Sequence, residues 1–112
     1  MIMTLLILQI AAAVVSAETR ERYEPFRQCL TEQARLVATP EQADEAILEQ
    51  ARSNCMAANL ASGSAALFAE IRSGATREQA LERVARLRLE VEQEALVAAR
   101  APKIDGETVA HH

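Results

Sequence analysis

The sequence predicts an all-α protein: a small antiparallel helical bundle, or a helical hairpin followed by a long C-terminal helix, after an N-terminal signal peptide. Three observations support this. After residue 17 the chain is rich in Ala, Leu, Glu, Gln and Arg, the strong helix formers. Its apolar residues recur at intervals of three and four, the spacing of one helix face. No run alternates apolar and polar residues, as a half-buried strand would.

Residues 1–17 have the features of a secretory signal peptide. They carry no charged side chain and lead directly into the charged segment 18–22. Val15 and Ala17 place small side chains in the A-x-A-like positions of a cleavage site, so we expect cleavage between Ala17 and Glu18. The segment lacks the basic residue with which such signals normally begin.

An uncleaved N-terminal membrane anchor is therefore the alternative hypothesis for residues 1–17. The segment lies at the short end of the roughly 17 to 25 apolar residues that span a bilayer, and Gln9 interrupts it. Basic residues follow the segment at Arg20, Arg22 and Arg27, which would place the rest of an anchored protein in the cytoplasm. The two cysteines favour export instead.

The remaining chain is predicted to form one small domain. All charged residues follow Ala17, so this part has a net charge of 12 − 16 = −4. We expect a helical domain over residues 18–101 and a disordered tail over 102–112, where Pro102 and Gly106 interrupt the helical pattern. The acidic balance and the scarcity of aromatic residues disfavour nucleic acid as a partner.

Cys29 and Cys55 are predicted to form an intramolecular disulfide, the usual state of one cysteine pair in an exported protein. Two buried free thiols or an intermolecular bridge are the alternatives. No His or third Cys lies near either residue, so a zinc site would lack ligands. The pair does not form a C-x-x-C motif, so no thioredoxin-type redox role is indicated.

Two helices are expected around these cysteines, the first from Pro25 to about Ala38. The segment 39–42 has the pattern of a capping box that would open the second helix at Thr39. The apolar stripe of the first helix comprises Phe26, Cys29, Leu30, Leu36 and Val37, and that of the second comprises Ile47, Leu48, Ala51, Cys55 and Ala58.

A disulfide constrains where the turn between these helices lies. Cys29 is ten residues before Thr39 and Cys55 sixteen after it, which are heights of roughly 15 and 24 Å in two antiparallel helices. Bridged Cα atoms are usually about 4.4 to 6.8 Å apart. The disulfide therefore predicts a turn over about residues 39–43, with the main helix beginning near Asp44.

The rest of the chain contains one clear helix-end signal and one clear helix-start signal. Ser73 and Gly74 are expected to end the second helix, which we expect to continue, with a bend, through Gly63. The segment 76–79, Thr-Arg-Glu-Gln, is a second capping box and opens a long last helix that reaches Arg100. Core contacts before the turn are assigned to Leu67, Phe68 and Ile71.

The last helix has a wider apolar face than one packing partner requires. Leu81, Val84, Leu87, Val91 and Ala95 form one stripe. Ala85, Leu89 and Leu96 lie beside it, so we expect Leu89 and Leu96 to face a protein partner or a second copy of the chain. The alternative is that both earlier helices cover this face. On the same helix, Glu82 with Arg86 and Arg88 with Glu92 are spaced for i,i+4 ion pairs.

No pattern in the sequence indicates catalysis, a metal site or a cofactor. The only histidines, His111 and His112, lie at the very end of the chain, where nothing orients them as a general base or as strong metal ligands. No serine has a nearby histidine to activate it. Glu90, Glu92 and Glu94 are either a solvated helix face or a patch of carboxylates that raise one another's pKa.

The sequence therefore favours a small periplasmic or secreted helical protein with one disulfide. We expect it to act through its surface, as a non-catalytic interaction, chaperone-like or stress-related module. The alternative is a membrane-anchored accessory subunit that keeps residues 1–17 as its anchor. A membrane is a partner only in this second case.

Overall fold

The structure of the chain is a computed structural model that describes residues 14–102. This range folds into four α-helices and contains no β-strand, which confirms the all-α class. Residues 1–13 and 103–112, which hold most of the expected signal peptide, most of the expected tail and both histidines, lie outside the described residues. The helices are α2 (Ala17–Val37), α3 (Asp44–Asn54), α4 (Met56–Arg72) and α5 (Arg77–Arg100).

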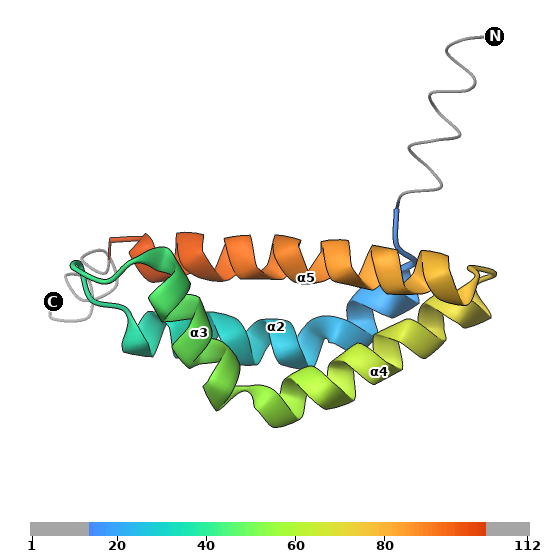
Figure 1. Cartoon of the computed structure of the whole chain (residues 1–112), viewed down its shortest axis with the longest axis horizontal. Helices are drawn as coiled ribbons and strands as arrows, with labels where there is room; N and C mark the ends of the chain where they lie inside the picture. Colours follow the sequence, from blue (N-terminus) through green and yellow to red (C-terminus); the bar gives the residue numbers. More distant parts are fainter. Residues whose placement is uncertain (1–13, 103–112) are drawn as a thin grey trace, which may run out of the picture.

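Helix α2 is the central element, because it packs against α3, α4 and α5. Figure 1 shows α5 along one side of the molecule and α4 slanting away from it, starting at the turn that joins the two. The core lies where the inner faces of these helices meet α2. Its fully buried side chains include Phe26, Leu30, Ile47 and Val91.

Helix α2 begins eight residues before the expected start at Pro25, so that expectation was wrong. Ser16 caps the helix, since its hydroxyl oxygen accepts a hydrogen bond from the Thr19 N–H at 3.1 Å. Pro25 lies inside the helix, where it removes one backbone donor. The burial of Thr19 and Tyr23 before it offsets this cost, because both side chains reach the core only if the helix continues through Pro25.

The turn between α2 and α3 lies where the disulfide predicted it. Cys29 and Cys55 are bonded, with their Cα atoms 6.0 Å apart, and α3 begins at Asp44. Thr39 does not cap a helix. Its N–H donates to Gln42 Oε1 at 2.8 Å instead, which stabilises a tight turn at Pro40 and Glu41.

The break in the second helical segment falls at Cys55 and not at Gly63, where we expected a bend. Cys55 has φ −110° and ψ 21°, and α3 and α4 meet there at an angle that is clear in Figure 1. Gly63 continues α4 without interruption. The reason is tertiary: the disulfide holds Cys55 against α2, and the chain changes direction at this fixed point.

Helix α4 packs on α2 through small residues. Ser62, Ala66 and Ala69 are at most 3% exposed, whereas Phe68 is 58% and Ile71 38% exposed. The expectation that Phe68 and Ile71 supply the core contacts was therefore wrong. Small side chains allow two helix axes to approach closely, so the large side chains on this helix point elsewhere.

The signals before α5 are confirmed. Ser73 is the C-cap of α4, and Gly74 follows it with φ 107°, a conformation that favours glycine. Thr76 and Gln79 form a reciprocal capping box: the Thr76 hydroxyl accepts from the Gln79 N–H at 3.1 Å, and the Thr76 N–H donates to Gln79 Oε1 at 3.0 Å.

Candidate functional site

Three grooves run along α5, one between α4 and α5 and two between α2 and α5. The first lies between α4 and α5, has a volume of about 610 Å³ and is called here the apolar groove. The second lies between α2 and α5, has a volume of about 270 Å³ and is called here the charged groove. The apolar groove is lined by Tyr23, Arg52, Asn59, Gly63, Leu67, Leu81, Val84, Ala85, Arg88, Leu89 and Glu92.

The apolar groove is lined on one side by the part of the wide apolar face of α5 that the core does not cover. Leu87 and Val91, four residues apart, are buried against the rest of the core. Leu81 and Leu89 lie on the adjacent strip of α5 and are 50% and 66% exposed. Helix α4 slants away from α5 (Figure 1), and Leu81 and Leu89 line the groove between the two helices.

Helix α4 supplies the opposite wall through Gly63 and Leu67. Since the small residues of α4 are turned toward α2, Leu67 remains partly exposed along the groove. Leu60 precedes Leu67 by two helical turns, so it lies on the same side of α4, and it is 69% exposed. Leucine side chains therefore flank the groove on both walls.

Charged groups gather at one end of the apolar groove around Glu92. Its Oε2 accepts from Arg52 Nε at 2.8 Å and from Arg88 Nε at 3.2 Å, and the residue is 7% exposed. Two guanidinium groups thus neutralise one nearly buried carboxylate. This end of the groove offers polar contacts, whereas the rest of its lining is mostly apolar.

Tyr23 lines both the apolar groove and the charged groove. Its ring packs edge-to-face on Phe26 with centroids 5.2 Å apart, and its hydroxyl makes no hydrogen bond to the described residues. Burial raises the pKa of Tyr23 to about 12; Arg88 lowers it and Glu92 raises it by smaller amounts. The hydroxyl therefore stays neutral, and the residue is 2% exposed.

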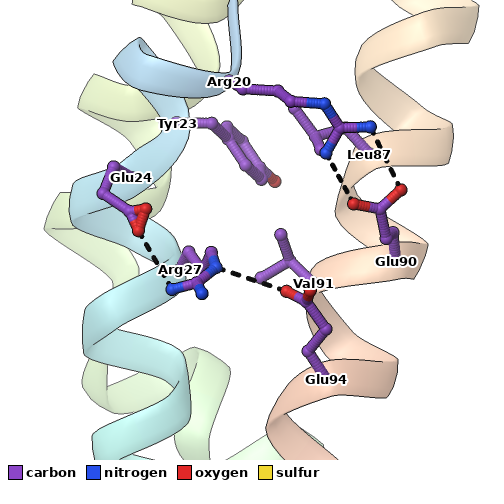
Figure 2. Close-up of a pocket in the computed structure, with 8 residues that line it drawn as sticks. All are labelled: Arg20, Tyr23, Glu24, Arg27, Leu87, Glu90, Val91 and Glu94. Carbon is purple, nitrogen blue, oxygen red and sulfur yellow. Dashed lines mark hydrogen bonds and ion pairs between the residues drawn. The ribbon is translucent and has the colours of Figure 1, made fainter. Parts of the chain in front are cut away.

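The charged groove is closed by its own ion pairs. In Figure 2, side chains of α2 reach across to carboxylates of α5. Arg20 donates to both Glu90 oxygens, at 2.6 and 3.3 Å, and Arg27 lies 3.3 Å from Glu94 while also donating to Glu24 at 3.0 Å. Because each of these charges is already paired, the charged groove offers no free group to a charged ligand.

The carboxylates of α5 do not form a crowded acidic patch. Glu90 pairs with Arg20, Glu92 with Arg52 and Arg88, and Glu94 with Arg27. The hydrogen bond from Arg20 lowers the pKa of Glu90 more than its desolvation raises it. For Glu90, pairing with Arg20 is therefore the dominant interaction.

The two residues expected to face a partner differ in the structure. Leu89 is 66% exposed on the wall of the apolar groove, whereas Leu96 is 8% exposed and belongs to the core. A buried side chain cannot face a partner, so the expectation for Leu96 was wrong. Sequence reasoning missed Leu67 and Tyr23 as lining residues, because the slant of α4 has no local signal in the chain.

The described residues contain no arrangement that points to a known chemistry. Both thiols are in the disulfide, and no group of three or more His, Cys, Asp or Glu side chains is placed to hold a metal ion within residues 14–102. In the same range no helix is long and apolar enough to cross a membrane. Val15 and Ser16, beside the expected cleavage position at Ala17 and Glu18, pack against the folded domain.

Comparison of the chain with protein families, with curated proteins and with solved structures finds no match in any of the three. The fold and the site together define a class in general terms: a small helical bundle with one disulfide and an uncovered apolar groove.

Proposed function

We propose that the chain is an exported, non-catalytic module of the bacterial envelope that binds apolar helical segments of other proteins in the apolar groove. The apolar N-terminal segment supports export. The Cys29–Cys55 disulfide agrees with it, because disulfides persist in oxidising compartments such as the periplasm.

The observation that carries the binding proposal is the uncovered leucine lining of the groove. Leu81 and Leu89 on α5 face Leu67 on α4 across a space of about 610 Å³. Contiguous apolar surface of this kind is costly to leave in water and commonly marks an interaction site. Polar groups are confined to the end near Arg52 and Glu92, where they would orient a bound segment.

An amphipathic helix is the ligand shape that fits best. The groove runs between α4 and α5, with Tyr23 of α2 beneath it. A ligand helix placed in it would pack on these helices as a further helix of the bundle. Packed helix axes lie about 8 to 10 Å apart, and such a ligand would present apolar residues at three- and four-residue spacing. Tyr23 forms part of the buried floor of the groove.

The binding proposal is tested by suppression of aggregation. Chemically unfolded citrate synthase is diluted into buffer with and without the purified protein, and light scattering is followed. We expect wild-type protein to lower the scattering and Leu89→Asp to lose most of this effect, because the new carboxylate would be buried against the bound segment.

Leu36→Asp is the matched control, since Leu36 is 70% exposed on the outer face of α2 and does not line the groove. This variant should retain suppression. Absence of suppression by the wild type, or equal losses in both variants, would contradict the proposal. A wild-type dimer that Leu89→Asp converts to monomers, measured by sedimentation equilibrium, would instead assign the groove to a second copy of the chain.

The second candidate function, a membrane-anchored accessory subunit, is favoured by the N-terminal end of α2. Val15 is 8% exposed and Ser16 caps the helix, so these two residues before the expected cleavage position pack on the domain. The test is intact mass, without reductant, of the protein from soluble envelope and membrane fractions. A soluble chain that begins at Glu18 and is two hydrogens lighter supports export; an uncleaved membrane-bound chain supports the anchor.

A further inference from the structure

One buried carboxylate holds the N-terminal end of α2. Glu70 in α4 is 1% exposed, and its Oε1 accepts hydrogen bonds from the Ser16 N–H at 3.0 Å and from the Thr19 hydroxyl at 2.6 Å. Its other oxygen, Oε2, accepts from Arg83 Nη1 on α5 at 2.8 Å. A single side chain thus gathers donors from the start of α2 and from α5.

The charge on Glu70 depends on these donors. Burial alone raises the pKa of Glu70, but the hydrogen bonds from Thr19, Ser16 and Arg83 together outweigh burial and lower it. The side chain is therefore a carboxylate whose negative charge is stabilised only while its donors remain in place. Loss of a donor to a buried carboxylate is costly.

Cleavage between Ala17 and Glu18 changes this site directly. Hydrolysis of the bond consumes one water and leaves a carboxylate on Ala17 and an amine on Glu18, which takes up a proton at neutral pH. The Ser16 N–H and the Ser16 cap of Thr19 are lost to the mature chain. The new positive charge arises at a helix N-terminus, where the helix dipole disfavours a cation.

The donor that Glu70 loses and the positive charge that the start of α2 gains can compensate one another, because the new ammonium is itself a donor. Glu18 lies in the sequence between Ser16 and Thr19, the two residues whose groups reach Oε1 of Glu70. The new ammonium is therefore created next to Thr19 in the chain and two residues from the donor that is lost. The carboxylate of Glu18 does not compete for its own ammonium, because Arg72 holds it at 2.8 Å and Arg22 lies 3.7 Å away.

We propose that Glu70 is the binding site for the α-ammonium group of the mature chain, which replaces the Ser16 N–H as a donor to Oε1. This inference rests on the proposed export and on cleavage at Ala17–Glu18. Arg83 keeps its bond to the other oxygen, and Thr19 remains in place. Leader removal then leaves α2 fixed to α4 by a buried ion pair in place of a neutral hydrogen bond.

The test uses protein purified from the soluble envelope fraction of an exporting bacterium. Its N-terminus is first established by intact mass. The folded protein is then treated with a limiting amount of an acetylating N-hydroxysuccinimide ester at neutral pH, and acetylation is located by peptide mapping. Lys103 is the only lysine of the chain, so it is an internal reference for amine reactivity.

We expect the α-amine, relative to Lys103, to react about tenfold more slowly in the folded protein than in urea, because an ion pair withholds the free amine. Glu70→Gln should restore its reactivity in the folded state. Glu90→Gln is the matched control, since it removes an exposed carboxylate paired with Arg20, and should leave the reactivity unchanged.

The outcomes separate the two proposals. An uncleaved chain overturns both. An N-terminus at Glu18 with equal amine reactivity in the folded and unfolded protein overturns the Glu70 site and leaves export intact. An N-terminus that lies before Ser16 does the same, because the Ser16 amide N–H then keeps its place. If Glu70→Gln fails to fold, the reactivity of the α-amine in folded and in urea-unfolded wild-type protein still tests the Glu70 site.

Discussion

Removal of the Cys29–Cys55 bridge should destabilise the domain by about 3.5 kcal/mol. The bridge closes a loop with a sequence separation of 26. In the loop-entropy description, this closure restricts the unfolded chain by roughly 12 cal/mol/K, or about 3.5 kcal/mol at 25 °C. Cys55 is 2% exposed, so Cys→Ala at both positions is preferable to Cys→Ser, which would bury a hydroxyl.

The assay is urea unfolding of the wild type and of the Cys29→Ala/Cys55→Ala variant, followed by far-ultraviolet circular dichroism. With a typical slope of about 1 to 3 kcal/mol per molar urea, the midpoint should fall by more than about 1 M. In thermal unfolding, the same loss corresponds to about 14 to 28 °C for a domain of this size.

Reduced wild-type protein serves as the control and should unfold close to the double variant, because both lack the same cross-link. A loss smaller than about 1 kcal/mol would refute the reasoning. It would mean that the unfolded chain is already restricted in this region, or that the turn at residues 39–43 closes the hairpin without help from the bridge.

Three further predictions concern the packing of α4. Glu70→Gln should lower the free energy of unfolding by about 1 to 3 kcal/mol at pH 7. Because the pKa of Glu70 is lowered in the fold, the ionised carboxylate stabilises the protein above the unfolded value near 4.5, and this stabilisation is lost on acidification. The free energy of unfolding of the variant should therefore depend less on pH than that of the wild type between about pH 5 and 3. Ala66→Leu should lower the free energy of unfolding by about 1 to 3 kcal/mol, since Ala66 is fully buried, and no change in urea unfolding would contradict close packing on α2. Gly63→Ala should raise the melting temperature, because the added Cβ meets open space and alanine favours a helix. Gly74→Ala should lower the melting temperature, because its φ of 107° is unfavourable for alanine. A higher melting temperature for Gly74→Ala than for Gly63→Ala would contradict the assigned end of α4.

The partly exposed ion pairs should contribute less to the free energy of unfolding than the buried carboxylates do. Arg20 and Glu90 each keep nearly half of their side-chain surface in water, so their bidentate contact contributes on the order of 1 kcal/mol or less. Arg88 and Glu92 differ, because the carboxylate is 7% exposed and also binds Arg52. Electrostatics in this protein therefore has most effect where Glu70 and Glu92 enter the core.

Local signals made part of the fold predictable. The Ser73–Gly74 stop and the box at Thr76 and Gln79 involve only neighbouring residues, so their chemistry acts without the rest of the protein. The disulfide was predictable because the chain has one cysteine pair, and the spacing of that pair then fixed the turn near Gln42.

The candidate site was predictable only in part. The surplus apolar strip on α5 was visible in the spacing of Leu81, Leu89 and their neighbours. Which of these residues remain uncovered depends on where α4 lies, and no short-range pattern encodes the angle between two helices. Leu96 illustrates this: it has the same spacing as Leu89 and is nevertheless buried.

The sequence by itself determined the helical class, the cysteine pairing, the end of α4 and the start of α5, because capping, turn chemistry and apolar periodicity are local properties of the chain. Only the tertiary structure decided that α2 begins at Ala17, that Ala66 and not Phe68 faces the core, and that Glu70 is buried with three donors. Burial and buried charge pairs depend on the distance between helix axes. That distance is set by the sizes of the side chains on all the packed faces together.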